Sequence, residues 1–87
     1  MSAQCFIDLF DSAAFRGERR RIFGPVRLDA SMLGLDRAAD VSLRVGSRAA
    51  LRIEMTGGED KTLHAGEQVD TLDTSSIKSL EVRPQEE

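Results

Sequence analysis

Cys5 and His64 are the only cysteine and the only histidine of this 87-residue chain. Together they could supply a thiol nucleophile and its base, but a catalytic thiol needs that base close by. The two residues lie in different halves of the sequence, and no motif joins them. We therefore predict that Cys5 is a small core residue. His64 is expected at a turn or strand edge, since a zinc-type site needs three or four donors.

Acidic side chains of the second half are the other candidates for chemistry, because paired carboxylates can act as general acid and base. These residues are Glu59, Asp60, Glu67, Asp70 and Asp73. No recognisable motif links them, and a domain of this size has little room for a deep cleft. We interpret them as a solvated polar face. The sequence thus indicates no catalytic residue and predicts that the protein is not an enzyme.

A basic run, formed by Arg16, Arg19, Arg20 and Arg21, could bind an anion or a nucleic acid. The whole chain carries a net charge of −3, however, and has no Trp and no Tyr on which bases could stack. We predict a solvated hairpin strand whose charges keep an exposed sheet edge from pairing with other chains. No nucleic-acid partner is expected.

Length and composition indicate one globular domain, since hydrophobic residues make up 40% of the chain. A single cysteine cannot form an internal disulfide. The first residues show no basic region followed by a long apolar run, and no segment reaches membrane-spanning length. The sequence therefore predicts a cytoplasmic protein with no membrane partner.

Short alternating runs separated by glycine-containing turns predict an all-β chain. Strands are expected at 5–10, 18–23, 26–28, 41–45, 50–55, 59–64 and 77–82, with a polar loop at 70–75. Asp29 or Ser31 could cap one short helical turn. Such short strands are typical of a sandwich or a barrel.

The two halves of the chain repeat, because the segment around Gly17 aligns with that around Gly58 and 41–45 aligns with 78–82. We predict one domain, 1–87, folded as a two-sheet antiparallel β-sandwich of two Greek-key motifs. The first motif spans 1–46, a shortened second motif spans 47–83, and 84–87 form a tail.

The order of an aromatic residue, a glycine and a serine in the first half resembles the Greek-key motif of the βγ-crystallin family, in its microbial single-domain form. The residues are Phe10, Gly17 and Ser42. The resemblance implies that Phe10 packs over a folded hairpin and that Ser42 ties this hairpin down by hydrogen bonding. It also implies that Gly17 has a backbone conformation that a Cβ would oppose.

The second half keeps the glycine and the serine of this pattern as Gly58 and Ser79. Glu54 or Met55 stands at the place of the aromatic residue. The hairpin that follows is about three residues shorter than its counterpart. The structural motif is therefore expected to be incomplete in this half.

Many microbial members of the family bind two calcium ions through a loop of two Asn or Asp residues, two variable residues, a Ser or Thr, and a Ser. Aligned on Ser42 and Ser79, this chain has Val41 and Lys78 in place of the ligating hydroxyl. Calcium prefers several oxygen ligands, which neither side chain supplies. A shifted, weaker site could use Asp36, Asp40 and Asp73. The sequence thus predicts calcium binding that is weak or lost, and no other cofactor.

Two functions follow from these observations. The first is a non-enzymatic βγ-crystallin-like module with a structural or stress-related role. The alternative is a protein–protein interaction module, such as an inhibitor or neutralising partner of another protein. Whether the partner is another protein or a second copy of the chain is left open.

Overall fold

The computed structural model describes residues 5–33 and 40–85. Eight strands follow one another as β1 (Cys5–Phe10), β2 (Arg19–Gly24), β3 (Val26–Asp29), β4 (Asp40–Val45), β5 (Ala49–Met55), β6 (Lys61–Leu63), β7 (Gln68–Asp73) and β8 (Ile77–Pro84). Three short 3₁₀ turns connect some of them, namely η1 (Ala13–Phe15), η2 (Ala30–Leu33) and η3 (Thr74–Ser76).

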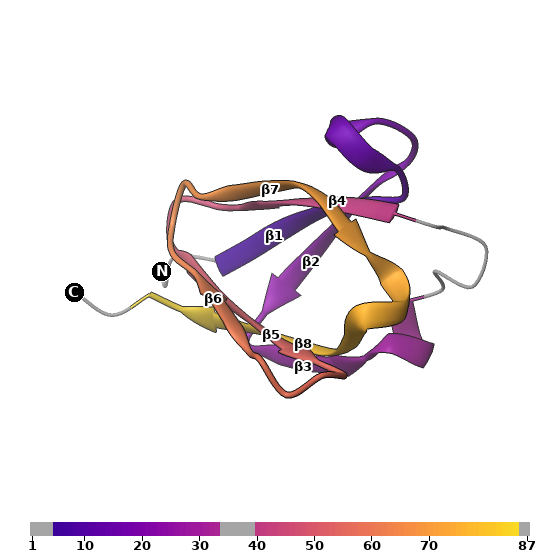
Figure 1. Ribbon diagram of the computed structural model, residues 1–87. Coiled ribbons are helices and arrows are strands. Elements are labelled where there is room, and N and C mark those ends of the chain that lie inside the picture. Colours follow the sequence, from indigo (N-terminus) through magenta and orange to yellow (C-terminus); the bar gives the residue numbers. More distant parts are fainter. Residues whose placement is uncertain (1–4, 34–39, 86–87) are drawn as a thin grey trace.

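The strands form two four-stranded antiparallel sheets that lie face to face (Figure 1). Sheet A has the order β2-β1-β4-β7, and sheet B has the order β3-β8-β5-β6. The predicted all-β fold class, a two-sheet antiparallel sandwich, is confirmed. The predicted helical turn near Asp29 is η2, and the helical turns of the described residues are all 3₁₀.

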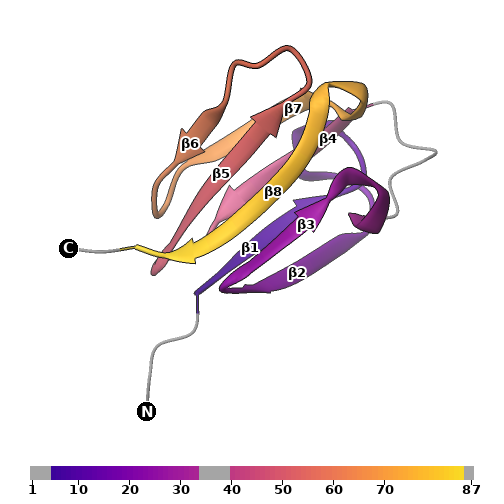
Figure 2. The same ribbon diagram turned by 90° about the horizontal axis from the view of Figure 1, so that it is seen from below.

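Each half of the chain lends its third strand to the other half (Figure 2). β3 from the first half pairs with β8, and β7 from the second half pairs with β4. Because of this exchange, neither half has a complete sheet of its own. The two halves must therefore fold together to bury their apolar faces.

Alternation along the strands builds the core between the sheets. In β1 the inward positions are Cys5, Ile7 and Leu9, and in β5 they include Leu51 and Ile53, all nearly inaccessible to solvent. The remaining buried members are aliphatic as well, and comprise Ile22, Leu33, Val41, Leu43, Val45, Ala49, Leu72, Ile77, Leu80 and Val82.

Two details differ from the sequence-based expectation. The segment expected as a polar loop at 70–75 belongs in large part to β7, with Val69 and Leu72 directed to the core, and ends in η3. The tail also begins later than expected, because β8 continues through Pro84. Gln85 is held in place, since its amide donates to the Arg48 carbonyl at 3.1 Å and its side-chain oxygen accepts from the Ala65 amide at 2.7 Å.

Candidate functional site

Ser42 closes the hairpin between β1 and β2 against sheet A. Its side chain is fully buried on β4, opposite Phe10. The Ser42 Oγ donates a hydrogen bond to the Ser12 carbonyl at 2.7 Å and accepts one from the Phe15 amide at 2.8 Å. The Phe15 ring packs edge-on to the Phe10 ring at 5.7 Å between centroids. One hydroxyl thus fixes a folded hairpin over an aromatic pair.

Backbone geometry in this hairpin is unusual at Gly17, whose φ is +82°. A Cβ there would collide with the Asp11 carboxylate. That carboxylate occupies the space because its Oδ1 accepts the Glu18 amide at 2.9 Å. Ala14 and Phe15 also have positive φ, near +60°, which side chains oppose. The Ser42 hydrogen bonds help to offset this local cost.

In the second half, register places Glu54 at the position of the aromatic residue. Glu54 lies opposite Ser79 as Phe10 lies opposite Ser42, whereas Met55 packs against the core. The Glu54 carboxylate accepts from Arg27 Nη2 at 3.2 Å. An ion pair at the protein surface therefore replaces the aromatic contact of the first half.

Gly58 holds the turn of the shorter hairpin, with a φ of +89°. Its amide donates to the Met55 carbonyl at 3.0 Å. Nothing lies within 4 Å of a Cβ built at Gly58, in contrast to Gly17. Ser79 of β8, the partner of Glu54, is 1% exposed. The second hairpin is thus held by its turn and by neighbouring backbone rather than by a packed aromatic pair.

Of the predicted calcium candidates, Asp40 and Asp73 come together and Asp36 lies outside the described residues. Asp40 and Asp73 are direct partners across β4 and β7. Asp73 Oδ1 already accepts two hydrogen bonds, from the Ser75 amide at 2.9 Å and the Ser75 hydroxyl at 2.8 Å. These bonds hold the pKa of Asp73 below its usual value, with the hydroxyl the larger cause.

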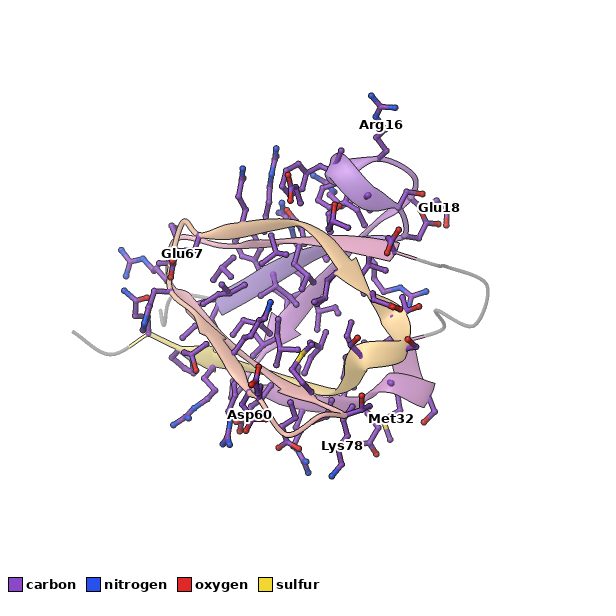
Figure 3. The ribbon with its side chains drawn as sticks, in the orientation of Figure 1. Arg16, Glu18, Met32, Asp60, Glu67 and Lys78 are labelled. Atoms are coloured by element: carbon purple, nitrogen blue, oxygen red, sulfur yellow. The ribbon has the colours of Figure 1, made fainter. Side chains whose placement is uncertain are left out.

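The two positions that differ from the calcium pattern are both unsuited to an ion. Val41 is completely buried in the core, and the exposed Lys78 projects on the side of sheet B near Asp60 (Figure 3). The hydrogen bond from Arg52 is the main cause that lowers the pKa of Asp60, and the charge of Lys78 lowers it further. Within 5–33 and 40–85, no three Asp, Glu, His or Cys side chains are grouped so that they could hold a metal.

Asp73 is expected to contribute to stability at neutral pH and to lose that contribution in acid. Its folded pKa lies below the unfolded value of about 4, so the contribution is complete above pH 4 and disappears as the pH falls through the folded pKa. The free energy of unfolding, measured with urea at a series of pH values, should therefore fall less steeply in acid for Asp73→Asn than for wild type. Asp70→Asn, which removes an exposed carboxylate of the same strand, is the control. The same loss of unfolding free energy in acid for wild type and Asp73→Asn would contradict the contribution assigned to Asp73.

Arg19, Arg20 and Arg21 of the basic run lie on β2, which is an edge strand of sheet A as expected from its charges. Arg21 and Asp8 face each other across β1 and β2 and form two parallel hydrogen bonds, Nε to Oδ1 at 2.9 Å and Nη2 to Oδ2 at 3.2 Å. Arg20 Nη1 donates to the Leu33 carbonyl at 2.6 Å. Arg16 projects outward from the hairpin (Figure 3). Arg20 and Arg21 thus make structural contacts, whereas Arg16 faces solvent.

Cys5 and His64 occupy different environments. Cys5 is 2% exposed in the core, whereas His64 is exposed at the end of β6. His64 borders a shallow depression of about 240 Å³ on the outer side of sheet B, which is lined by Ala50, Arg52, Thr62, His64, Arg83, Pro84 and Gln85. This lining contains no carboxylate and no thiol. The depression therefore lacks a nucleophile–base pair.

Several contacts of sheet A were not anticipated from the sequence, chiefly Arg44 and Asp8. The Arg44 guanidinium lies over the Phe15 ring at 4.3 Å and near the Phe10 ring at 5.9 Å. Strand alternation alone places Phe6, Asp8 and Phe10 on one face of β1. The sequence of β1 thus indicated which of its side chains share a face. Their partners on β2 and β4 depend on strand register, which the sequence does not show.

Comparison with known proteins gives a match in structure. No protein-family model and no curated protein sequence matches the chain. A solved structure described as "Evolution of the eye lens beta-gamma-crystallin domain fold" matches with a TM-score of 0.69 and 25% sequence identity, over 98% of this chain and 91% of that one. None of the described helices is long and apolar enough to cross a membrane. The exchanged strands, the hairpin closed by Ser42 and this match together show that the chain has the βγ-crystallin domain fold.

Proposed function

We propose that this protein is a non-enzymatic βγ-crystallin-like module with a structural or stress-related role, in which calcium binding is weak or lost. The fold is the starting point, but folds of this kind host more than one function. The proposal therefore rests on the side chains at the positions where family members bind calcium.

The segment from the end of β7 to the start of β8 carries the proposal. Here, Asp73 Oδ1 is occupied by two hydrogen bonds from Ser75, and Lys78 stands where a ligating hydroxyl is needed. A calcium ion would have to compete with both bonds and approach the positive charge of Lys78. These features support a module that is stable without the ion.

The placement of Cys5 and His64 supports the absence of catalysis. A nucleophilic thiol must reach its substrate, and the Cys5 side chain is buried among aliphatic residues. A buried thiol away from solvent behaves as a small apolar side chain.

Calcium at about 1 mM is expected to leave the thermal unfolding midpoint unchanged. A ligand stabilises the folded state by RT ln(1 + [L]/Kd), so a site with a Kd near 10 μM would add about 2.7 kcal/mol at this concentration. For a domain of this size, that free energy corresponds to a rise of roughly 10–20 °C. Circular dichroism melts of the full chain, dialysed against chelator and then titrated, measure this directly.

Magnesium at the same concentration controls for ionic strength, and Asp40→Asn with Asp73→Asn controls for a shifted site between β4 and β7. A calcium-specific rise of several degrees in wild type that disappears in the double variant would overturn the calcium part of the proposal. It would show instead that the facing carboxylates hold the ion.

A further inference from the structure

All four phenylalanines of the chain lie on the outer side of sheet A, and none belongs to the buried cluster between the sheets. Phe6 and Phe10 alternate with the core residues of β1, and Phe23 pairs with Phe6 across β2. Phe15 reaches the same side from η1 and packs on Phe10. Aromatic side chains usually fill cores, so their collection on one outer face calls for an explanation.

Arginine side chains lie over these rings. The Arg21 guanidinium is 4.2 Å from the Phe6 ring centroid, and its Nε and Nη2 donate to Asp8. Arg44 covers Phe15. Arg19 lies on β2 directly opposite Phe10, on the same face as Arg21. Stacked guanidinium groups lose little freedom when they bind a carboxylate. We call Phe6, Arg19, Arg21, Phe23 and Arg44 the aromatic–arginine patch.

Phe23 is the accessible apolar member of this patch. Its side chain is 53% exposed although it contacts Phe6, with 6.1 Å between ring centroids. In the described residues, the other exposed large hydrophobic side chain is Met32, at 62%. Figure 3 shows Met32 in η2 on the side of sheet B, away from the hairpin that carries Arg16. The two exposed hydrophobic residues therefore lie on different surfaces.

The equivalent face of sheet B has a different character. Register places Arg52 opposite Glu81, where sheet A has Asp8 opposite Arg44. Two of its arginines form ion pairs with carboxylates, Arg27 with Glu54 at 3.2 Å and Arg52 with Asp60 at 2.8 Å. The patch of sheet A has one ion pair within the described residues, between Arg21 and Asp8. Arg19 and Arg44 form no ion pair with those residues. The excess positive charge of the patch is local, because the whole chain is acidic.

We propose that the aromatic–arginine patch is a docking surface for an acidic protein segment, which places carboxylates on Arg19, Arg21 and Arg44 and an apolar side chain on Phe23. Charge complementarity identifies this partner. Aromatic residues and arginine are also the side chains enriched at protein–protein hot spots. A single half-exposed ring is a poor platform for successive bases, which favours protein over nucleic acid. This inference goes beyond the structural role proposed above.

The test is an amide NMR titration of the full chain with a short synthetic peptide that has leucines at its centre and glutamates around them. At low salt, shifts are expected in β1, β2 and β4 but not in β5 or β8. Binding should weaken at least about tenfold when salt is raised to roughly 0.5 M, because exposed charge pairs are screened. A peptide with lysines in place of the glutamates should not bind.

Matched variants locate the interaction. Phe23→Ser and Arg44→Gln should each weaken peptide binding about tenfold, as expected for hot-spot residues. Met32→Ser removes a similarly exposed hydrophobic residue, and Arg83→Gln removes an exposed arginine of sheet B, so both should bind like wild type. Circular dichroism of each variant verifies folding.

Four results would overturn the proposal. They are no shifts at millimolar peptide, equal losses in Met32→Ser and Phe23→Ser, tighter binding of an oligothymidine than of the acidic peptide, and a dimer of the free protein in sedimentation that is lost in Phe23→Ser. The last result would assign the patch to a second copy of this chain. None of these outcomes depends on calcium, so this proposal and the structural one fail independently.

Discussion

Replacing Ser42 with alanine is expected to lower the free energy of unfolding by about 2–3 kcal/mol. The substitution removes the acceptor of the Phe15 amide and the donor to the Ser12 carbonyl, both in a partly buried hairpin. Each such group left without a partner costs about 1–3 kcal/mol. The thermal midpoint of a domain this small should fall by roughly 10–20 °C.

Ser12→Ala is the matched control in the same hairpin. Its side chain caps nothing in η1, although its carbonyl is the Ser42 partner. The control should therefore change stability by less than about 0.5 kcal/mol. Urea unfolding of both variants compares them directly. If Ser42→Ala and Ser12→Ala had the same small effect, the Ser42 hydroxyl would not be what closes the hairpin.

Gly17→Ala should be the other strongly destabilising change, by about 2–3 kcal/mol. A side chain opposes the positive φ at Gly17 at a cost of about 1–2 kcal/mol. The new methyl group would also displace the Asp11 carboxylate from the Glu18 amide, a hydrogen bond worth about 1 kcal/mol. Chemical denaturation measures the sum of both effects.

Gly58→Ala separates the two causes. Gly58 has a similar φ, +89°, but open space around its Cβ position. Gly58→Ala should therefore cost only the conformational part, about 1–2 kcal/mol, and less than Gly17→Ala. In an Asp11→Ala background, Gly17→Ala should cost no more than Gly58→Ala does, since the displaced contact is already gone. Equal effects of the two glycine substitutions in the wild-type background would show that Asp11 does not constrain this turn.

Much of the fold could be predicted because it depends on neighbouring residues. Strict alternation in 41–45 and 50–55 places Leu43, Val45, Leu51 and Ile53 on inward faces, as in the structure. The fold class also followed from the repeat of such runs and from the resemblance carried by Phe10, Gly17 and Ser42. In the structure, Gly17 has a positive φ and Ser42 bonds the hairpin, which are the roles that the resemblance implies.

β7 could not be recognised because its periodicity is broken. A register shift between Val41 and Leu43 of β4 lets Val69 and Leu72, three residues apart, both face the core. A period of two, the usual strand signal, is therefore absent from this segment. The same long-range pairing brings Asp40 opposite Asp73, which no local pattern indicates.

Residue types and near neighbours were enough to predict the strands with regular alternation, the turns at Gly17 and Gly58, and the absence of a hydroxyl at Val41 and Lys78. The exchange of β3 and β7, and the position of Glu54 rather than Met55 opposite Ser79, became visible in the folded chain. The stacking of Arg21 and Arg44 on the outer aromatic rings also required the fold. These features depend on strand register, because the side chains that meet across a sheet are set by how distant strands align, and one bulge changes that alignment.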